Sequence, residues 1–140
     1  MTSRYMLDTD TCACILRRSS PELLDHIQSV PLEQQCMSVV TFAELTYGIQ
    51  LSTSKKANQA AVEALVRHVE VLDWSRAAAG HYAEIRAELK RRGQLISAND
   101  LLIGAHARSL GATLVTHNVK DFGRIKGLSV EDWMTRSKKA

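Results

Sequence analysis

Three acidic residues stand where the sequence predicts strands to end or helices to begin. Asp8 follows the short apolar run 5–7, while Glu44 and Asp100 each fall in the first turn of a predicted helix. In an open parallel sheet, ligands gather at the carboxyl ends of the strands, near the point where the strand order reverses, so the three acids can meet at one rim. Two carboxylates about 4 Å apart repel by about 4 kcal/mol at an effective dielectric constant of about 20, so three that converge without basic partners need a cation or a proton.

A site made of carboxylates alone indicates which cation. Oxygen ligands suit Mg²⁺ or Mn²⁺, whereas zinc is expected to recruit His or Cys. The five histidines show no HExxH spacing and the three cysteines form no CxxC pair; His68, His81 and His106 lie at helical positions typical of packing or surface residues. Mg²⁺ held by few carboxylates keeps coordination sites for water and phosphate oxygens, which is the chemistry of phosphodiester hydrolysis.

Each of the three acids also has a purely structural interpretation. The segments 41–44 and 97–100 both fit the capping box, in which the acid bonds back to the amide of the residue that caps the helix. Asp8 can brace the turn 8–11. Helix N-termini favour carboxylates through their exposed N–H groups, so the same positions can hold unpaired acids for a metal. The joint occurrence of three such acids favours the metal site.

A further polar segment, residues 116–121, follows the fourth predicted strand. Asn118 can offer a carbonyl oxygen and Asp121 a carboxylate to the same rim. Because Asn and Asp also favour ordinary turns, a turn is the structural alternative for both residues.

The elements that must position these residues alternate along the chain. Short apolar runs between amphipathic helices predict a parallel sheet covered by helices, an α/β fold. Strands are predicted at 5–7, 36–40, 69–72, 113–115 and 128–131, and helices at 11–17, 21–30, from 41 to beyond 48, 55–68, 75–92 and 97–110. Gly93 and Gly111 end the last two helices. No repeat, linker or low-complexity segment divides the chain, so residues 1–140 are expected to form a single domain.

The composition is that of a folded domain expected in the cytoplasm. The 140 residues are 45% hydrophobic and 24% charged, and no apolar run approaches the roughly 20 residues that span a bilayer. The N-terminal segment lacks the apolar stretch of a secretory signal. Cys12, Cys14 and Cys36 are expected to be reduced thiols packed as small hydrophobic side chains.

The charge is mildly basic, with a net charge of +3 and a pI near 8.9. Basic residues cluster at 17–18, 55–56, 90–92, 120–126 and 136–139. Each cluster alone is typical of a solvated helix end. Basic rims around an acidic pocket, however, suit a polyanion that must be held while metal ions contact it.

Four segments resemble PIN-domain ribonuclease toxins of the VapC type. The first two are MLDTD at 6–10 and SVVTFAEL at 38–45, the second followed by Tyr47-Gly48. The third, the strongest match, is QLISANDLLIGAHA at 94–107. The fourth runs from LVTHN at 114–118 through Phe122, Gly127-Leu128 and Glu131-Asp132-Trp133. The segments cover nearly the whole chain in the right order and at the right separations, which makes the resemblance specific.

The resemblance implies a single PIN-like domain with a central parallel sheet of about five strands, and Mg²⁺- or Mn²⁺-dependent endoribonuclease activity. It makes Asp8, Glu44 and Asp100 the catalytic, metal-binding acids, with Asp8 and Asp100 as direct ligands and Glu44 coordinating the metal or orienting water. Thr9, Thr41 and Thr116 match polar positions that support those acids, and we count Asn118 and Asp121 of the segment 116–121 as further supporting residues. Asp10 stands where the family usually has Asn or Ser. Asn118 stands where many relatives place a fourth acid, which leaves open one metal or two.

The resemblance also implies partners. It predicts the toxin of a type II toxin–antitoxin system, a homodimer, inhibited by a cognate antitoxin that inserts a segment, often with a basic side chain, into the acidic pocket. The implied substrates are structured RNAs such as tRNA. No membrane association is expected.

Two other functions are compatible with parts of the sequence. The Asp8-Thr9-Asp10 opening is similar to that of haloacid-dehalogenase-like phosphatases, in which the first Asp is a nucleophile. That family requires Thr or Val where Cys12 stands and a late acidic pair, which is missing here. Alternatively, the acids are helix caps and the protein is an inactive RNA-binding or interaction module. Unchanged RNA cleavage after Asp8→Asn would indicate such a module.

Overall fold

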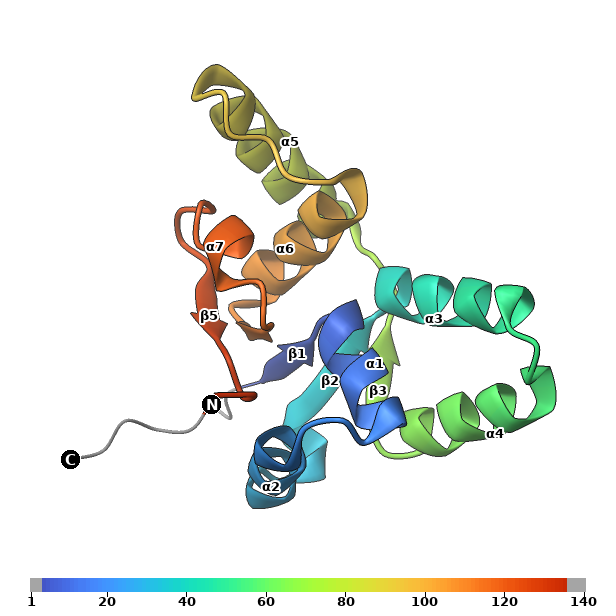
Figure 1. Cartoon of the computed structure of the whole chain (residues 1–140). Coiled ribbons are helices and arrows are strands. Elements are labelled where there is room, and N and C mark those ends of the chain that lie inside the picture. Colours follow the sequence, from blue (N-terminus) through green and yellow to red (C-terminus); the bar gives the residue numbers. More distant parts are fainter. Residues whose placement is uncertain (1–3, 136–140) are drawn as a thin grey trace.

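The computed structural model describes residues 4–135. Its centre is a five-stranded parallel sheet with the strand order β3-β2-β1-β4-β5 (Figure 1). The strands are β1 (Tyr5–Leu7), β2 (Gln35–Ser38), β3 (Glu70–Leu72), β4 (Thr113–Val115) and β5 (Ser129–Glu131). The predicted α/β fold with about five parallel strands is therefore confirmed.

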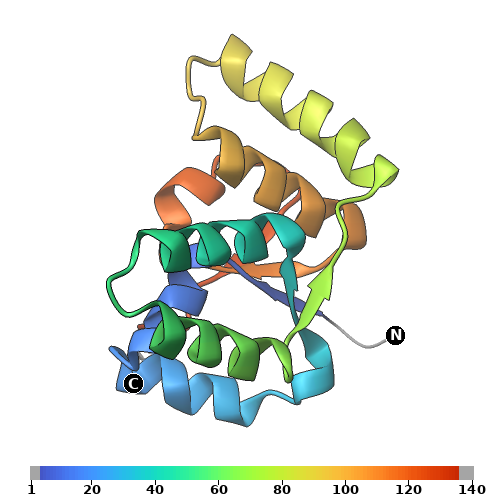
Figure 2. The ribbon, with the colours of Figure 1, turned by 90° about the vertical axis from the view of Figure 1, so that its right-hand side faces the viewer.

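Helices connect the strands and cover both faces of the sheet. They are α1 (Thr9–Arg17), α2 (Pro21–Ser29), the 3-10 helix η1 (Leu32–Gln34), α3 (Val39–Leu51), α4 (Lys55–Val66), α5 (Arg76–Arg91), α6 (Ala98–Leu110) and α7 (Val119–Phe122). Figure 2 shows α5 and α6 at the opposite end of the molecule from α2 and α4. The chain thus divides into two groups of helices with the sheet between them.

Two hydrophobic cores lie on the two faces of the sheet because successive strand residues point to opposite sides. Met6 packs with residues of α5, α6 and α7, whereas its neighbour Leu7 packs with residues of α1, α2, α3 and α4. Leu114 and Val115 divide in the same way. The near-continuous apolar character of these strands follows from burial on both faces.

Several predicted helix ends are confirmed. Ser75 and Ser97 cap α5 and α6, each accepting a hydrogen bond at its hydroxyl from a backbone N–H three residues on. Gly93 and Gly111 follow these helices with φ of 65° and 64°, the left-handed region that favours glycine. Local chemistry alone sets these boundaries.

The boundary between β2 and α3 differs from the predicted one. Val39 and Val40 are helical, whereas the sequence predicted them in a strand. Strand β2 ends at Ser38, and α3 begins at Val39 rather than at Thr41. The cause is Ser38, whose hydroxyl accepts from the N–H of Val40 and caps the helix early. The short elements η1 and α7 were not predicted, because neither is long enough to show a hydrophobic period.

The three cysteines form no disulfide; Cys12 and Cys36 are buried and Cys14 is half-buried. Burial raises the pKa of the Cys12 thiol far above its usual range and that of Cys36 to about 11. Both thiols are therefore protonated and unreactive at neutral pH. Within residues 4–135, no helix combines the length and apolar character that a membrane crossing requires.

Candidate active site

The predicted acids lie near the topological switch point of the sheet, where the strand order reverses. From β1 the chain proceeds to β2 and β3 on one side, and later returns to β4 and β5 on the other. Asp8 ends β1, and its backbone N–H donates to the carbonyl oxygen of Val115 at the end of β4 at 3.0 Å. This topological switch point is where open α/β sheets bind ligands.

Asp8 is fixed at this point and is almost fully buried, with 4% of the residue exposed. It caps α1, and its Oδ1 accepts from the N–H of Thr11 at 2.9 Å. Burial raises the pKa of Asp8, and hydrogen bonds from Thr116 and Thr11, which stabilise the charged carboxylate, offset this only in part. The hydroxyl of Thr11 donates to the carbonyl oxygen of Val115 at 3.2 Å. Asp10 adds a smaller repulsion. A carboxylate offers about four lone-pair directions, so the cap leaves it acceptor capacity.

The prediction that Glu44 lies in the first turn of its helix is wrong, and the alternative interpretation of a capping box with Thr41 fails with it. Because α3 begins at Val39, Glu44 lies in its second turn. Its Oε1 accepts from the hydroxyl of Thr9, and its Oε2 accepts from the side-chain amide of Asn99 at 3.0 Å. Glu44 is therefore held by side chains from α1 and α6, and not by its own backbone.

Two threonines predicted to support the acids lie beside Glu44. The hydroxyls of Thr9 and Thr41 are 3.3 Å apart, and Thr41 is fully buried. Asn99, which donates to Glu44, was not predicted as part of the site. Its only sequence signal is a polar side chain next to Asp100, at a helix start where solvent-facing polar residues are common.

Asp100 lies in the first turn of α6, as predicted, and its N–H donates to the Ser97 hydroxyl at 3.3 Å. Burial raises the pKa of Asp100 above its ordinary value; a hydrogen bond with the Ser97 side chain offsets part of the rise, and repulsion from Glu44, Asp10 and Asp121 adds to it, in that order. Asp10 thus lies within electrostatic range of both Asp8 and Asp100, and Glu44 and Asp121 lie within range of Asp100. The side chains concerned are Asp8, Asp10, Glu44, Asp100 and Asp121, which we call the acidic group.

Asn118 and Asp121 mainly bond to each other. The side-chain oxygen of Asn118 caps α7 by accepting from the N–H of Asp121 at 3.4 Å, and its amide donates to Asp121 Oδ2 at 3.1 Å. Asp121 Oδ1 also faces the guanidinium of Arg124 at 3.6 Å. The carbonyl oxygen of Asn118 is thereby occupied by the helix cap, and Asp121 has a basic neighbour that the other acids lack.

The acidic group has ligands suited to a divalent cation, but its side chains do not form a complete coordination shell. Between residues 4 and 135, no three His, Cys, Asp or Glu side chains are close enough together to enclose a metal ion. Within the same range, the charged groups that shift the pKa of Asp8 and Asp100 are all acidic. Carboxylate oxygens with unneutralised charge fit Mg²⁺ or Mn²⁺, since Mg²⁺ keeps several waters and is held through one or two carboxylates.

Comparisons with known proteins agree with this geometry. The family model described as "PIN domain" matches residues 5–128. The "tRNA(fMet)-specific endonuclease VapC" of Salmonella typhimurium is 38% identical over 130 residues, which cover 93% of this chain and 98% of that protein.

Solved structures of VapBC complexes also contain chains similar to this one. VapBC2 from Rickettsia felis, bound to a DNA fragment from its promoter, contains a chain that is 35% identical with a TM-score of 0.87; the alignment covers 92% of this chain and 98% of that one. DNA-bound VapBC from Salmonella typhimurium contains one that is 36% identical with a TM-score of 0.89, covering 94% and 99%. Neither comparison favours a phosphatase.

Proposed function

The chain belongs to the PIN-domain family and is a VapC-type endoribonuclease toxin, and from this premise we propose that its acidic group binds Mg²⁺ or Mn²⁺ and directs the hydrolysis of structured RNA. Family membership makes the activity dependent on a divalent metal. The identity of the metal, the residues that hold it and the RNA that is cut are parts of the proposal.

One observation carries the assignment of the site. Asp100 is repelled by three other carboxylates, and no basic side chain among residues 4–135 is near enough to lower its pKa. Unpaired, half-buried carboxylates cost stability, so they persist in a fold where function requires them. A bound cation removes this repulsion.

The roles of the chain's own residues follow from their positions. Asp8 and Asp100 are the metal ligands, because acidic and not basic side chains lie near each of them, and a carboxylate that accepts hydrogen bonds at its caps still has lone pairs for a cation. Glu44, held from two sides by Thr9 and Asn99, is oriented to hold the attacking water or to complete the ligand set. Thr116 fixes the carboxylate of Asp8. The metal, when bound, supplies charge stabilisation and a water of lowered pKa.

The partners are inferred from the relatives. The Salmonella protein is named for tRNA(fMet), and we extend tRNA as a substrate class to this chain. The similar structures are VapBC complexes, so a cognate antitoxin is its protein partner, and we place an antitoxin cation at the acidic group of each subunit of a homodimer. We further propose that residues 1–140 form one domain and that the protein acts in the cytoplasm.

The test is the loss of metal-dependent cleavage after a change that preserves shape. Asp100→Asn or Asp8→Asn is expected to lower the rate of tRNA cleavage in Mg²⁺ by at least about 100-fold, since each removes a ligand charge. Cleavage is measured on purified tRNA with a Mg²⁺ or Mn²⁺ titration, and folding by circular dichroism.

Asp25→Asn, at an exposed acid on α2, is the matched control and should cleave like the wild type. If a folded Asp100→Asn variant kept its cleavage rate, the acidic group would not be the active site. Absence of cleavage in the wild-type protein, with binding of RNA retained, would instead indicate an inactive RNA-binding module.

A further inference from the structure

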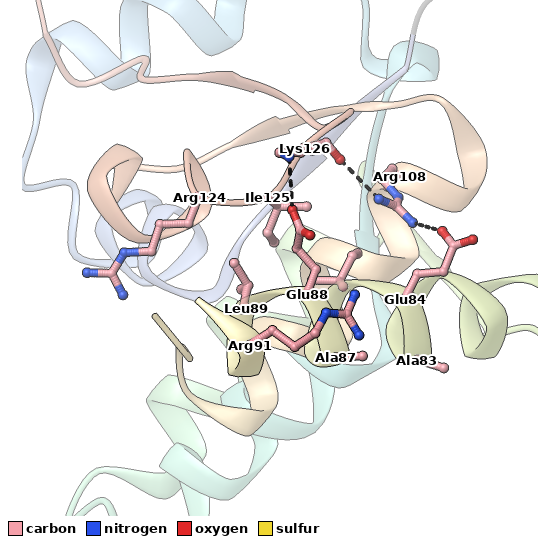
Figure 3. A pocket seen from close by; sticks show the side chains of 11 residues that line it. Ala83, Glu84, Ala87, Glu88, Leu89, Arg91, Arg108, Arg124, Ile125 and Lys126 are labelled. Carbon is pink, nitrogen blue, oxygen red and sulfur yellow. Dashed lines mark hydrogen bonds and ion pairs between the residues drawn. The ribbon is translucent and has the colours of Figure 1, made fainter. Parts of the chain in front are cut away.

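A cavity of about 580 Å³ lies between α5 and the segment that follows α7, with α6 behind it (Figure 3). Its charged lining residues are Glu84, Glu88, Arg91, Arg108, Arg124 and Lys126. We call this feature the basic cavity. Four cations face two carboxylates, so its lining carries the opposite sign of charge from the acidic group.

Two of the four cations form ion pairs with the carboxylates of the lining itself. Arg108 of α6 donates to Glu84 and to His81 of α5, and also to the carbonyl oxygen of Lys126. The ammonium of Lys126 lies 3.2 Å from Glu88. These contacts tie α5 and α6 to the segment after α7 and neutralise both acids of the lining.

The other two cations, Arg91 and Arg124, supply the excess positive charge. Arg91 is exposed and forms no ion pair with any residue in the range 4–135. Arg124 lies at one end of the lining in Figure 3, with its guanidinium turned away from Arg108 and Glu84. It donates to the carbonyl oxygen of Gln94 at 3.3 Å and faces Asp121 at 3.6 Å.

Arg124 connects the basic cavity to the acidic group. Its ion-pair partner Asp121 belongs to the acidic group and accepts from the side-chain amide of Asn118, which follows β4, at 3.1 Å. The two features therefore share a border along α7 and the residues after it. A phosphodiester chain whose scissile phosphate reaches the acidic group has the basic cavity beside it.

Cations next to the acidic group would offset the repulsion between its carboxylates and the phosphates of the RNA. A group of unpaired carboxylates repels the polyanion that it must cut, and the metal neutralises the scissile phosphate only. Neighbouring phosphates need their own cations, and the planar guanidinium of Arg matches phosphate oxygens with two parallel hydrogen bonds.

We infer that Arg91 and Arg124 bind phosphates that flank the scissile one and so position the RNA strand over the basic cavity. The inference rests on the proposed ribonuclease function and adds to it the residues that hold the substrate. Both are positioning residues, because neither is placed at the reacting phosphate.

The experiment measures binding without cleavage. The Asp100→Asn protein is titrated with fluorescently labelled tRNA in buffer containing EDTA, at several NaCl concentrations. Adding Arg91→Ala or Arg124→Ala is expected to weaken binding by roughly three- to tenfold and to lower the slope of log K against log[NaCl] by about 0.7–0.9, the value for one lost phosphate contact. A residue with only a structural role would not change this slope.

Two further variants control the interpretation. Arg67→Ala removes the exposed arginine that follows α4, and should leave the affinity and the slope unchanged. Figure 2 shows α4 and α5 at different ends of the molecule. Arg124→Lys keeps the charge but loses the paired hydrogen bonds, so it should retain the salt slope while weakening binding. In otherwise wild-type protein, Arg91→Ala should raise KM for tRNA and leave kcat within about twofold.

Two results would overturn the inference. If Arg91→Ala and Arg124→Ala bind tRNA with the wild-type affinity and salt slope, RNA does not pass over the basic cavity. If they lose only inhibition by the antitoxin, the cavity binds that protein instead. In either case, metal-dependent cleavage by the wild type would leave the proposed ribonuclease function standing.

Discussion

The pKa values of carboxyl groups shift in opposite directions in the acidic group and in the basic cavity. In the acidic group, the pKa values of Asp8 and Asp100 are raised, by burial first and by neighbouring acids after it. In the basic cavity, the pKa of Glu88 is lowered, mainly by the ammonium of Lys126 and also by Arg92. Carboxylates with cationic partners hold helices together, while carboxylates without such partners remain available for a ligand.

This difference indicates which charges the fold needs and which it tolerates. Exposed ion pairs such as those of Glu84 and Glu88 contribute little to stability, because water screens them. The unpaired acids at the switch point oppose folding, and their position is maintained by the surrounding hydrogen bonds from threonines and Asn99. The substitutions below add a charge to one of these two regions or remove a charge from it.

The largest effect is expected from giving the acidic group a permanent cation. Asn99→Lys places an ammonium beside Glu44 and is expected to reduce Mg²⁺-dependent tRNA cleavage by about 100-fold, because it competes with the metal for the carboxylates. The same variant should melt at a higher temperature than the wild type in EDTA.

Asn99→Gln keeps the amide and serves as the control, with cleavage within a few-fold of wild type. Cleavage assays and thermal melts on the same preparations test both expectations. Full activity of Asn99→Lys would mean that Glu44 and its neighbours are not where the metal acts.

A smaller effect is expected from removing one repelling charge. Asp100→Asn should raise the Tm of the metal-free protein at pH 7 by roughly 1–3 °C, a modest gain because water screens this half-buried group. The sign follows from the raised pKa of Asp100. As the pH rises through the ordinary carboxyl pKa, the unfolded chain releases its proton before the folded one does, so the wild type loses stability.

The pH dependence provides the check. Below the ordinary carboxyl pKa both proteins carry a neutral group at position 100, and their Tm values should converge. A Tm difference that stays constant from pH 3 to pH 7, measured by circular dichroism, would contradict an electrostatic origin.

The smallest effect is expected in the basic cavity. Glu88→Gln removes an exposed carboxylate with a lowered pKa and should change the Tm at pH 7 by less than about 1 °C, because exposed ion pairs contribute little. It should also strengthen tRNA binding slightly, by up to about twofold, since Lys126 and Arg92 lose their partner. A large loss of stability would show that this region, too, depends on its charges.

The local features of the fold were predictable because they depend on neighbouring residues. Ser97 and Gly111 mark the two ends of α6 through a side-chain cap and a positive φ, and both were identified in advance. Ser38 was not, since the β-branched pair Val39-Val40 after it favours a strand by propensity. A cap hydrogen bond and tertiary packing overrode that propensity.

The candidate site was predictable in its carboxylates but not in what surrounds them. Asp8, Glu44 and Asp100 stand out by type and spacing, whereas Asn99 and Arg124 look like ordinary surface residues in the sequence. The contact of Asn99 with Glu44 joins two helices across 55 residues of the chain, and no local pattern encodes it. Arg124 and Asp121 are only three residues apart, but the sequence does not show that this pair lies between the acidic group and the basic cavity.

The sequence by itself determined the order of strands and helices, the ends of several helices and the identity of the acids, because all of these follow from residue type and short-range periodicity. Only the tertiary structure decided that the acids converge and that a basic cavity borders them. The physical reason is the parallel sheet: the pairing of β1 with both β2 and β4 joins segments distant in sequence, and this pairing creates the switch point around which the acids gather.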